Sequence, residues 1–415
     1  MTTATRMSHC RFCNGALSIP FCDLGEMPLA NAFVPLERGD AADPMFPLNA
    51  VVCERCYLVQ LDHVVDATAI FSDYAYFSSF SSTWLAHAAA FTRDATARYG
   101  LGADSFVVEV ASNDGYLLRN FVAAGVPCLG IEPAANVAAV AVASGVPTEV
   151  AFFGVDCARR IVAERGPAGL IVANNVLAHV PDVNDFVAGL AILAGSAGTV
   201  SIEAPHLLAL MEQTQFDTIY HEHYAYWSLH AMRQVLAAHG LLVYGVEVLP
   251  THGTSLRVLA SADTSAGARY GRFALAAVEA AETAAGLGTP APYRDFEPKV
   301  RAIVSAFRAW LDAERAAGRR VAAYGAAAKG NTFLNAARVT RDEIVCVADR
   351  NPVKQNTLLP GSHIPVVSPE ALLAARPDDV LILPWNIASE IAGELRPVRE
   401  WGGHLLVAVP DMRAV

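Results

Sequence analysis

The sequence predicts an α/β protein in three parts, and three observations divide its 415 residues in this way. Two Cys-x-x-Cys pairs lie near the N-terminus, at Cys10 and Cys13 and at Cys53 and Cys56. Apolar runs alternate with helical stretches from Phe106 onward, and a second alternating region follows near the C-terminus. Such alternation predicts parallel sheets with crossover helices. We therefore expect a small cysteine-bearing module, a central Rossmann-like domain and a second, C-terminal Rossmann-like α/β domain.

The cysteine pairs predict a metal centre in the first part. Each pair places two thiolates on one turn, and four thiolates complete the tetrahedral shell of Zn²⁺. The 39 residues between the pairs exceed the spacing of a compact zinc ribbon, so the intervening segment folds as a loop of its own. A closed shell leaves no open coordination position, which favours a structural zinc ion at Cys10, Cys13, Cys53 and Cys56. The alternative is four unrelated buried thiols.

Charge and hydropathy restrict the partners. A formal net charge of -11 argues against general affinity for nucleic acid, although a local basic pocket for a diphosphate is compatible with it. The chain has no apolar run of about 18 residues, and its N-terminus lacks the apolar core of a signal peptide. We expect a cytoplasmic protein that binds a small ligand, with no membrane or nucleic acid partner.

The second part begins with a strand that leads into a polar turn. Glu109 lies near the end of this strand, and Gly115 opens the following helix. A dinucleotide fingerprint requires G-x-G-x-x-G, but acidic and amide residues replace two of these glycines. The pocket therefore suits the cationic sulfonium of S-adenosylmethionine better than a pyrophosphate. Strands are expected at 106–110, 128–132, 170–174 and 198–203.

Later strand ends add to this donor site. Glu132 follows Gly115 by seventeen residues, close to the offset of about 20 at which an acid receives ribose hydroxyls. Residues at the carboxyl ends of strands in open α/β sheets meet ligands. The alternative for Glu109 and Glu132 is that both are solvated charges at strand ends. The expected donor-binding residues are Glu109, Ser112, Asn113, Asp114, Gly115, Glu132, Asn174 and Asn175.

Residues 217–227 concentrate tyrosines, histidines and a carboxylate in one short segment. Methyl transfer to carbon requires a nucleophilic carbon, commonly made by removing a proton beside a carbonyl while the enolate oxygen is stabilised. A histidine oriented by a carboxylate can accept that proton. In a regular strand Glu222 and His223 would face opposite sides, so a joint role requires a turn. Two alternatives are a metal site at His221, Glu222 and His223, and a satisfied core.

An aromatic and serine-rich run at 71–82 precedes the first α/β region. We interpret it as a lid over the methyl donor or as a segment that packs one domain on another. In the third part, two long helices are expected at 266–285 and 293–317, with a Gly- and Pro-containing linker between them. Strands starting near Val321, Ile344, Val380 and Leu405 follow.

The order of motifs along nearly the whole chain resembles the deoxysugar C-methyltransferase family of actinomycete antibiotic pathways. It looks closest to the C-3′-methyltransferases of dTDP-3-amino-2,3,6-trideoxy-4-keto-hexoses, as in D-tetronitrose biosynthesis. The motifs are the two cysteine pairs, Leu24-Gly25-x-x-Pro28-Leu-Ala-Asn31, Tyr74-Ala-Tyr76-Phe-Ser, Glu109-x-x-Ser-Asn113-Asp114-Gly115, Tyr220-His-Glu-His223 and Tyr324-Gly-Ala-Ala-Ala-Lys329-Gly330-Asn331.

The resemblance implies that the C-4 keto group acidifies the C-3 hydrogen, that a base removes it and that the enolate attacks the sulfonium methyl. It makes His223 with Glu222 the expected base. Tyr220, Tyr74 and His179 are expected to position the sugar, stabilise the enolate or move the proton, and which group takes the proton stays open.

The resemblance also implies that the C-terminal domain holds the thymidine diphosphate, with Lys329 near anionic oxygens. One departure is that Gln355-Asn356 stands where a glycine is expected, which leaves the ligand role of the Asp349 turn open. The expected substrate-binding residues are Tyr76, Ser79, His252, Arg257, Tyr324, Gly325, Lys329, Gly330, Asn331 and Asp349.

We predict a monomer with a zinc-binding module at 1–70, a methyltransferase domain that binds S-adenosylmethionine at 71–265 and a sugar-nucleotide domain at 266–415, with the active cleft between the last two. Two alternatives remain. One is an NAD-dependent oxidoreductase that uses the region of Gly325 and Gly330, and the other is a nucleotide-sugar-binding protein without catalysis.

Overall fold

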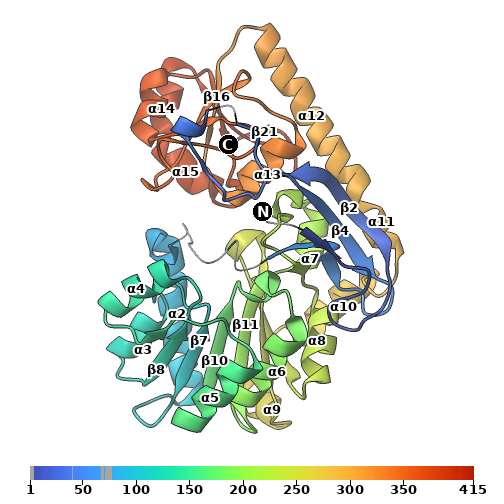
Figure 1. Cartoon of the computed structure of the whole chain (residues 1–415), viewed down its shortest axis with the longest axis vertical. Coiled ribbons are helices and arrows are strands. Elements are labelled where there is room, and N and C mark those ends of the chain that lie inside the picture. The colour runs from blue at the N-terminus through green and yellow to red at the C-terminus, as the bar shows by residue number, and fades with distance from the viewer. Residues whose placement is uncertain (1–3, 40, 67–69, 71–76) are drawn as a thin grey trace.

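The computed structural model describes residues 4–39, 41–66, 70 and 77–415. Two α/β units lie at opposite ends of the molecule, and the N-terminal sheet lies beside them (Figure 1). The predicted fold class, an N-terminal module and two α/β units, is confirmed. Among the described residues no helix combines the length and apolar character needed to cross a membrane.

The N-terminal part is built on a four-stranded antiparallel sheet with the order β12-β5-β4-β2. Three of its strands come from the cysteine module, β2 (Leu17–Met27), β4 (Phe46–Cys53) and β5 (Val59–Leu61). The fourth, β12 (Ala225–Tyr226), comes from the middle of the chain. A separate ribbon pairs β1 (Ala4–Arg6) with β6 (His63–Val65).

The central unit is a seven-stranded sheet with the order β13-β14-β11-β10-β7-β8-β9. Its core strands are parallel, and β14 runs antiparallel to both of its neighbours. The direction of strand addition reverses between β7 and β10, where doubly wound sheets open a ligand crevice at the strand carboxyl ends. The strands are β7 (Val107–Val110), β8 (Cys128–Ile131), β9 (Thr148–Glu149), β10 (Leu170–Asn174), β11 (Thr199–Pro205), β13 (Leu242–Leu249) and β14 (Ser255–Ser261).

Helices cover both faces of this sheet (Figure 1). An N-terminal serine starts α2, because the Ser81 hydroxyl accepts a hydrogen bond from the Trp84 N–H, and Gly100 ends the helix in the left-handed region. The helices of this unit are α2 (Ser82–Tyr99), α3 (Leu118–Ala123), α4 (Ala135–Ala143), α5 (Val155–Arg165), α6 (Val183–Ala194), α7 (Leu207–Glu212) and α8 (Leu229–Ala238).

The C-terminal unit contains an eight-stranded sheet with the order β21-β20-β19-β15-β16-β18-β17-β3. Its outermost strand, β3 (Val34–Pro35), belongs to the N-terminal part and pairs with β17 (Thr357–Leu358). The other strands are β15 (Val321–Tyr324), β16 (Ile344–Ala348), β18 (Pro365–Val367), β19 (Asp379–Ile382), β20 (His404–Val407) and β21 (Arg413–Ala414). Its helices are α13 (Ala328–Ala336), α14 (Pro369–Ala375) and α15 (Ala388–Glu394).

The helices between the two α/β units differ in part from the prediction. The single helix expected at 266–285 is wrong, because Gly271 and Phe273 have φ angles of 93° and 49° and divide it into α9 (Ala266–Tyr270) and α10 (Leu275–Ala284). After α11 (Ala291–Arg294), the long α12 (Phe296–Ala316) runs along the N-terminal sheet into the C-terminal unit (Figure 1). The ring of Phe296 stacks on Phe21 of β2, with centroids 4.4 Å apart.

Candidate active site and zinc centre

All three parts of the chain enclose one cavity of about 790 Å³. The N-terminal part contributes Leu29, Asn31 and Ala32. The central unit contributes the strand ends around β7, β8 and β10 and the segment from Thr218 to His223. The C-terminal unit contributes, among others, Ala327, Ala328, Lys329, Lys354 and Asn386. The cavity therefore joins the expected donor residues to the expected catalytic segment.

The turn after β7 is conformationally strained. Ala111, Asn113 and Gly115 have φ angles of 56°, 49° and 76°, so three of five consecutive residues are left-handed. A Cβ atom on Gly115 would lie 2.9 Å from the Val146 side chain, which explains the need for glycine in the turn. Strain of this kind concentrates where a backbone is shaped to receive a ligand.

Glu132 lies at the end of β8 and lines the cavity. Its carboxylate accepts hydrogen bonds from the N–H groups of Asn113 and Ala134, both at 2.9 Å, and burial raises its pKa. The side-chain oxygens of Asn174 and Asn175 are buried and have no hydrogen-bond partner among the described residues. These cavity-lining acceptors suit the hydroxyl and ammonium donors of S-adenosylmethionine.

Four of the expected donor residues, Glu109, Ser112, Asp114 and Gly115, lie beneath the cavity lining. Burial raises the pKa of Glu109 well above its usual range. The Asp114 carboxylate accepts the Ser79 N–H at 3.1 Å, and the Asn113 side-chain oxygen accepts the Ser78 N–H at 2.8 Å. The structure thus links this turn to the segment before α2, where Ser78, and not Ser79, lines the cavity.

Tyr220 and His223 form a hydrogen-bonded pair on the cavity wall. The Nδ1–H of His223 donates to the Thr218 carbonyl at 2.8 Å, since a carbonyl can only accept. Nε2 therefore carries the lone pair and accepts the Tyr220 hydroxyl, also at 2.8 Å. Burial, followed by the neighbouring His179, lowers the pKa of His223 well below its usual value, with Lys329 and His252 acting in the same direction. The imidazole is accordingly neutral at neutral pH and able to accept a proton.

Glu222 does not orient His223, which corrects the expected pairing. The chain turns at Glu222, so both side chains line the same cavity, but the Glu222 carboxylate accepts the Asn31 amide at 2.6 Å. The Glu222 carbonyl accepts Nδ1–H of His179 at 2.8 Å. Burial lowers the pKa of His179 to about 4, and its ring lies 4.8 Å from that of His223. The two imidazoles are thus oriented by backbone carbonyls.

His221 points away from this cluster. Its Nε2–H donates to the Phe46 carbonyl in the N-terminal sheet at 3.2 Å. The alternative metal site at His221, Glu222 and His223 is not formed, because within the described ranges the cysteines alone make a group able to hold a metal ion.

The C-terminal side of the cavity is basic. Lys329 lies in the first turn of α13, and its Nζ donates to the His252 carbonyl at 3.4 Å. Lys354 Nζ donates to the Ala326 carbonyl at 2.8 Å and lies 5.4 Å from the centre of the Phe33 ring. Burial lowers the pKa of both lysines. Two ammonium groups and a helix N-terminus at one end of a cavity favour an anionic ligand.

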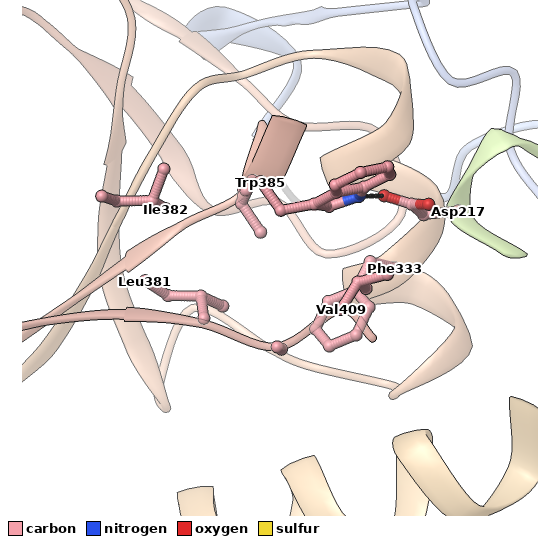
Figure 2. Close-up of a pocket in the computed structure, with 8 residues that line it drawn as sticks. Asp217, Phe333, Leu381, Ile382, Trp385 and Val409 are labelled. Carbon is pink, nitrogen blue, oxygen red and sulfur yellow. Dashed lines mark hydrogen bonds between the residues drawn. The ribbon is translucent and has the colours of Figure 1, made fainter. Parts of the chain in front are cut away.

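A small second cavity of about 10 Å³ lies between residues of β19 and α13 and is also lined by Asp217 and Trp385. Figure 2 shows the Trp385 indole reaching across it to Asp217, and its N–H donates to the Asp217 carboxylate at 2.7 Å. The ammonium of Lys329 lies 4.9 Å from the centre of the Trp385 ring, and burial raises the pKa of Asp217 while Lys329 opposes that shift. The Asp217 carboxylate and the Trp385 ring therefore both stabilise the Lys329 ammonium.

Several expected substrate residues lie outside the cavity lining. Arg257 forms ion pairs with Glu203 and Glu247, both at 2.8 Å, because the two acids lie directly opposite it on β11 and β13, the strands that flank β14. The Tyr324 hydroxyl donates to Glu394 at 3.2 Å. The residues away from the lining are Arg257, Tyr324, Gly325, Gly330, Asn331 and Asp349, whereas His252 and Lys329 line the cavity. Tyr74 and Tyr76 lie outside the described residues.

Some cavity residues were missed. Asn31 belongs to a motif that the resemblance includes without giving it a role, and Lys354 directly precedes Gln355 in the turn whose ligand role is left open. Thr218 acts through its carbonyl, which leaves no side-chain signal. Trp84 lines the cavity from α2, with its ring 5.1 Å from that of His252. An aromatic residue on an amphipathic helix is more typical of a core.

The four cysteine sulfurs lie within 4.8 Å of one another. Cys10 and Cys56 Sγ are 3.6 Å apart, and Cys13 and Cys53 Sγ are 3.4 Å apart. A tetrahedral Zn²⁺ with bonds of about 2.3 Å requires sulfurs about 3.8 Å apart, so the cluster fits a closed zinc shell. The buried Gln60 amide donates to Cys10 Sγ at 3.1 Å, and this bond orients one ligand.

Family models match three consecutive stretches of the chain. Residues 10–71 match a family described as "Putative zinc binding domain", residues 84–245 a methyltransferase domain, and residues 250–410 a C-methyltransferase C-terminal domain. The C-methyltransferase NovU of Streptomyces niveus is 34% identical over 409 residues, which cover 99% of this chain and 97% of the relative.

Solved structures resemble parts of the chain. The magnesium protoporphyrin IX methyltransferase of Synechocystis PCC 6803 with bound SAH is 18% identical, with a TM-score of 0.34, covering 42% of this chain and 82% of that one. A SAM-dependent methyltransferase from Anabaena variabilis is 14% identical, with a TM-score of 0.33, covering 41% and 83%.

Proposed function

This chain belongs to the C-methyltransferase family and depends on S-adenosylmethionine, and we propose that it methylates C-3 of a dTDP-linked 4-keto deoxysugar. The substrate we propose is a 3-amino-2,3,6-trideoxy-4-keto-hexose of antibiotic biosynthesis. One observation carries the proposal: a single cavity contains the donor-side acceptors, the Tyr220–His223 pair and the two lysines. Family membership also removes the oxidoreductase alternative and the alternative of a protein without catalysis.

S-adenosylmethionine, when bound, supplies a methyl carbon made electrophilic by the adjacent sulfonium. In our proposal the Glu132 carboxylate accepts hydrogen bonds from the ribose hydroxyls. The unpaired side-chain oxygens of Asn174 and Asn175 accept hydrogen bonds from other groups of S-adenosylmethionine. Glu132 also holds the strained turn in place, because its carboxylate accepts the Asn113 N–H.

His223 is the proposed final acceptor of the C-3 proton. As the C–H bond breaks, its electron pair moves toward the C-4 carbonyl and an enolate forms. The proton reaches Nε2 through the Tyr220 hydroxyl, which already occupies that lone pair, and Thr218 stabilises the imidazolium through Nδ1–H. His179 lies on the same wall and is proposed to position the sugar as a hydrogen-bond acceptor at Nε2, because its Nδ1–H already donates to the Glu222 carbonyl.

Lys329 and Lys354 are the proposed contacts of the diphosphate, together with the backbone N–H groups that open α13. This assignment places the sugar between the C-terminal unit and the histidines. It also explains how a chain with a net charge of -11 binds an anionic substrate, because the basic groups gather on one wall.

The test is incubation of the purified protein with methyl-labelled donor and a panel of dTDP sugars, followed by mass measurement of the products. We expect one added methyl on the 4-keto sugars and none on the matched 4-hydroxy sugars, in which C-3 is not acidic. In deuterated water without donor, the keto substrates should exchange the C-3 hydrogen. Methylation of the 4-hydroxy sugars would exclude the enolate route.

We also propose that the enzyme works as a monomer in the cytoplasm, as the sequence predicts. The mass of the purified protein in solution tests the first point, and fractionation of the producing cells tests the second.

A further inference from the structure

The N-terminal module reaches into the methyl-transfer site through one short segment. Residues 28–35, which we call the strap, leave β2, pass the cavity and end in β3 on the C-terminal sheet. Within the strap, Leu29, Asn31 and Ala32 line the cavity, and Phe33 lies against Lys354. The strap is therefore a wall of the site that the N-terminal part of the chain supplies.

Asn31 is the polar side chain that the strap places on this wall. Its amide donates to the Glu222 carboxylate at 2.6 Å, across 191 positions of sequence. Glu222 is only 3% exposed, and a buried carboxylate depends strongly on each donor that holds it. The backbone carbonyl of the same residue orients His179, so Asn31 contacts the residue that fixes one of the two cavity histidines.

We propose that Asn31 is a positioning residue of the methyl-transfer site, which fixes the Glu222 carboxylate and thereby makes the zinc-bearing module part of the catalytic apparatus. The inference rests on the proposed function for the reaction it serves. It predicts that loss of the amide lowers turnover and leaves binding of the donor and the zinc ion unchanged.

A structural role alone is a poor explanation, because the strap has other anchors. Val34 pairs with Leu358 in the C-terminal sheet, and Phe33 packs on Lys354. The chain also offers a matched control. In β4, the Asn49 amide donates to the Asp62 carboxylate at 2.9 Å, which is the same kind of contact in the same module but away from the cavity.

The experiment compares Asn31→Ala and Asn49→Ala in the full-length protein with zinc bound. We expect Asn31→Ala to lower kcat by about 10- to 100-fold, the worth of a hydrogen bond to a charged group, with the KM for the sugar, the donor Kd and the zinc content within about twofold. Asn49→Ala should keep the wild-type kcat. In a Glu222→Ala background, which removes the acceptor, Asn31→Ala should cause no further loss, because the two changes act at one contact.

A kcat within about twofold of wild type, an equal loss in Asn49→Ala, or losses that multiply in the double variant would overturn the inference. If the wild-type protein methylates no sugar of the panel, the proposed function fails by itself. The inference is then decided by a crystal structure of Asn31→Ala, which needs no substrate. A displaced Glu222 carboxylate supports it, and an unmoved one contradicts it.

Discussion

Replacement of His221 by glutamine tests whether burial keeps this imidazole, which lies outside the cavity, uncharged. His221 is 1% exposed, and burial lowers its pKa to about 4, although the Phe46 carbonyl favours the protonated form. Glutamine can keep the hydrogen bond to Phe46, because its amide nitrogen occupies a position similar to Nε2. The variant therefore removes the titrating group and retains the donor.

The sign follows from proton binding in the two states. The unfolded chain binds a proton at His221 below pH about 6.5, whereas the folded chain does so only below about 4. The stability present above pH 6.5 is therefore lost as the pH falls toward 4. Between pH 7 and 5 the free energy of unfolding of the wild type should fall by about 2 kcal/mol more than that of His221→Gln.

Urea unfolding of both proteins at the two pH values provides the measurement. Buried carboxyls with raised pKa, such as Glu109 and Asp217, oppose the trend but occur in both proteins and cancel in the difference. An NMR titration of labelled histidines gives the folded pKa directly, with the His221 signal assigned by its absence from the variant. An equal pH dependence in both proteins would refute the argument that burial keeps this imidazole neutral.

Other predictions concern the site. His223→Asn should lower turnover by about 10²- to 10⁴-fold and leave the donor Kd nearly unchanged, and unchanged turnover would remove His223 from the mechanism. Glu132→Ala should weaken donor binding about tenfold by calorimetry, and equal Kd values would refute its ribose role. Metal analysis should find about one zinc per chain, absent after joint replacement of Cys53 and Cys56 by serine. Lys329→Met should raise the KM for the sugar nucleotide about tenfold, with partial recovery in Lys329→Arg.

Local patterns made the fold predictable. The parallel strands and the cysteine cluster follow from hydrophobic periodicity and ligand spacing, and both agree with the structure. Two strands pair with the sheet of another part of the chain, β3 with the C-terminal sheet and β12 with the N-terminal sheet, and we call them the exchanged strands. They could not be predicted, because each has two residues and so shows no hydrophobic periodicity. Their pairing depends on the arrangement of distant parts of the chain.

The candidate site was predictable to a similar degree. Tyr220 and His223 stood out because polar aromatic residues are dense around them, and they form a hydrogen-bonded pair. Other contacts of the site leave no signal in the sequence. Asn31 is far from Glu222, which it contacts, and Thr218 orients His223 through its backbone carbonyl. Arg257 was assigned to the substrate because nothing in its own strand shows that Glu203 and Glu247 face it from the neighbouring strands.

The two exchanged strands also constrain how the protein is made. The ribosome releases the cysteine module first, but its sheet lacks the edge strand β12 until Ala225 and Tyr226 have been synthesised. The C-terminal sheet, released last, takes its outermost strand from Val34 and Pro35, which must remain available until then. A fragment that ends near residue 70 would lack β12, and a fragment that starts near residue 266 would lack β3. The three parts should therefore mature together, as one unit of biosynthesis.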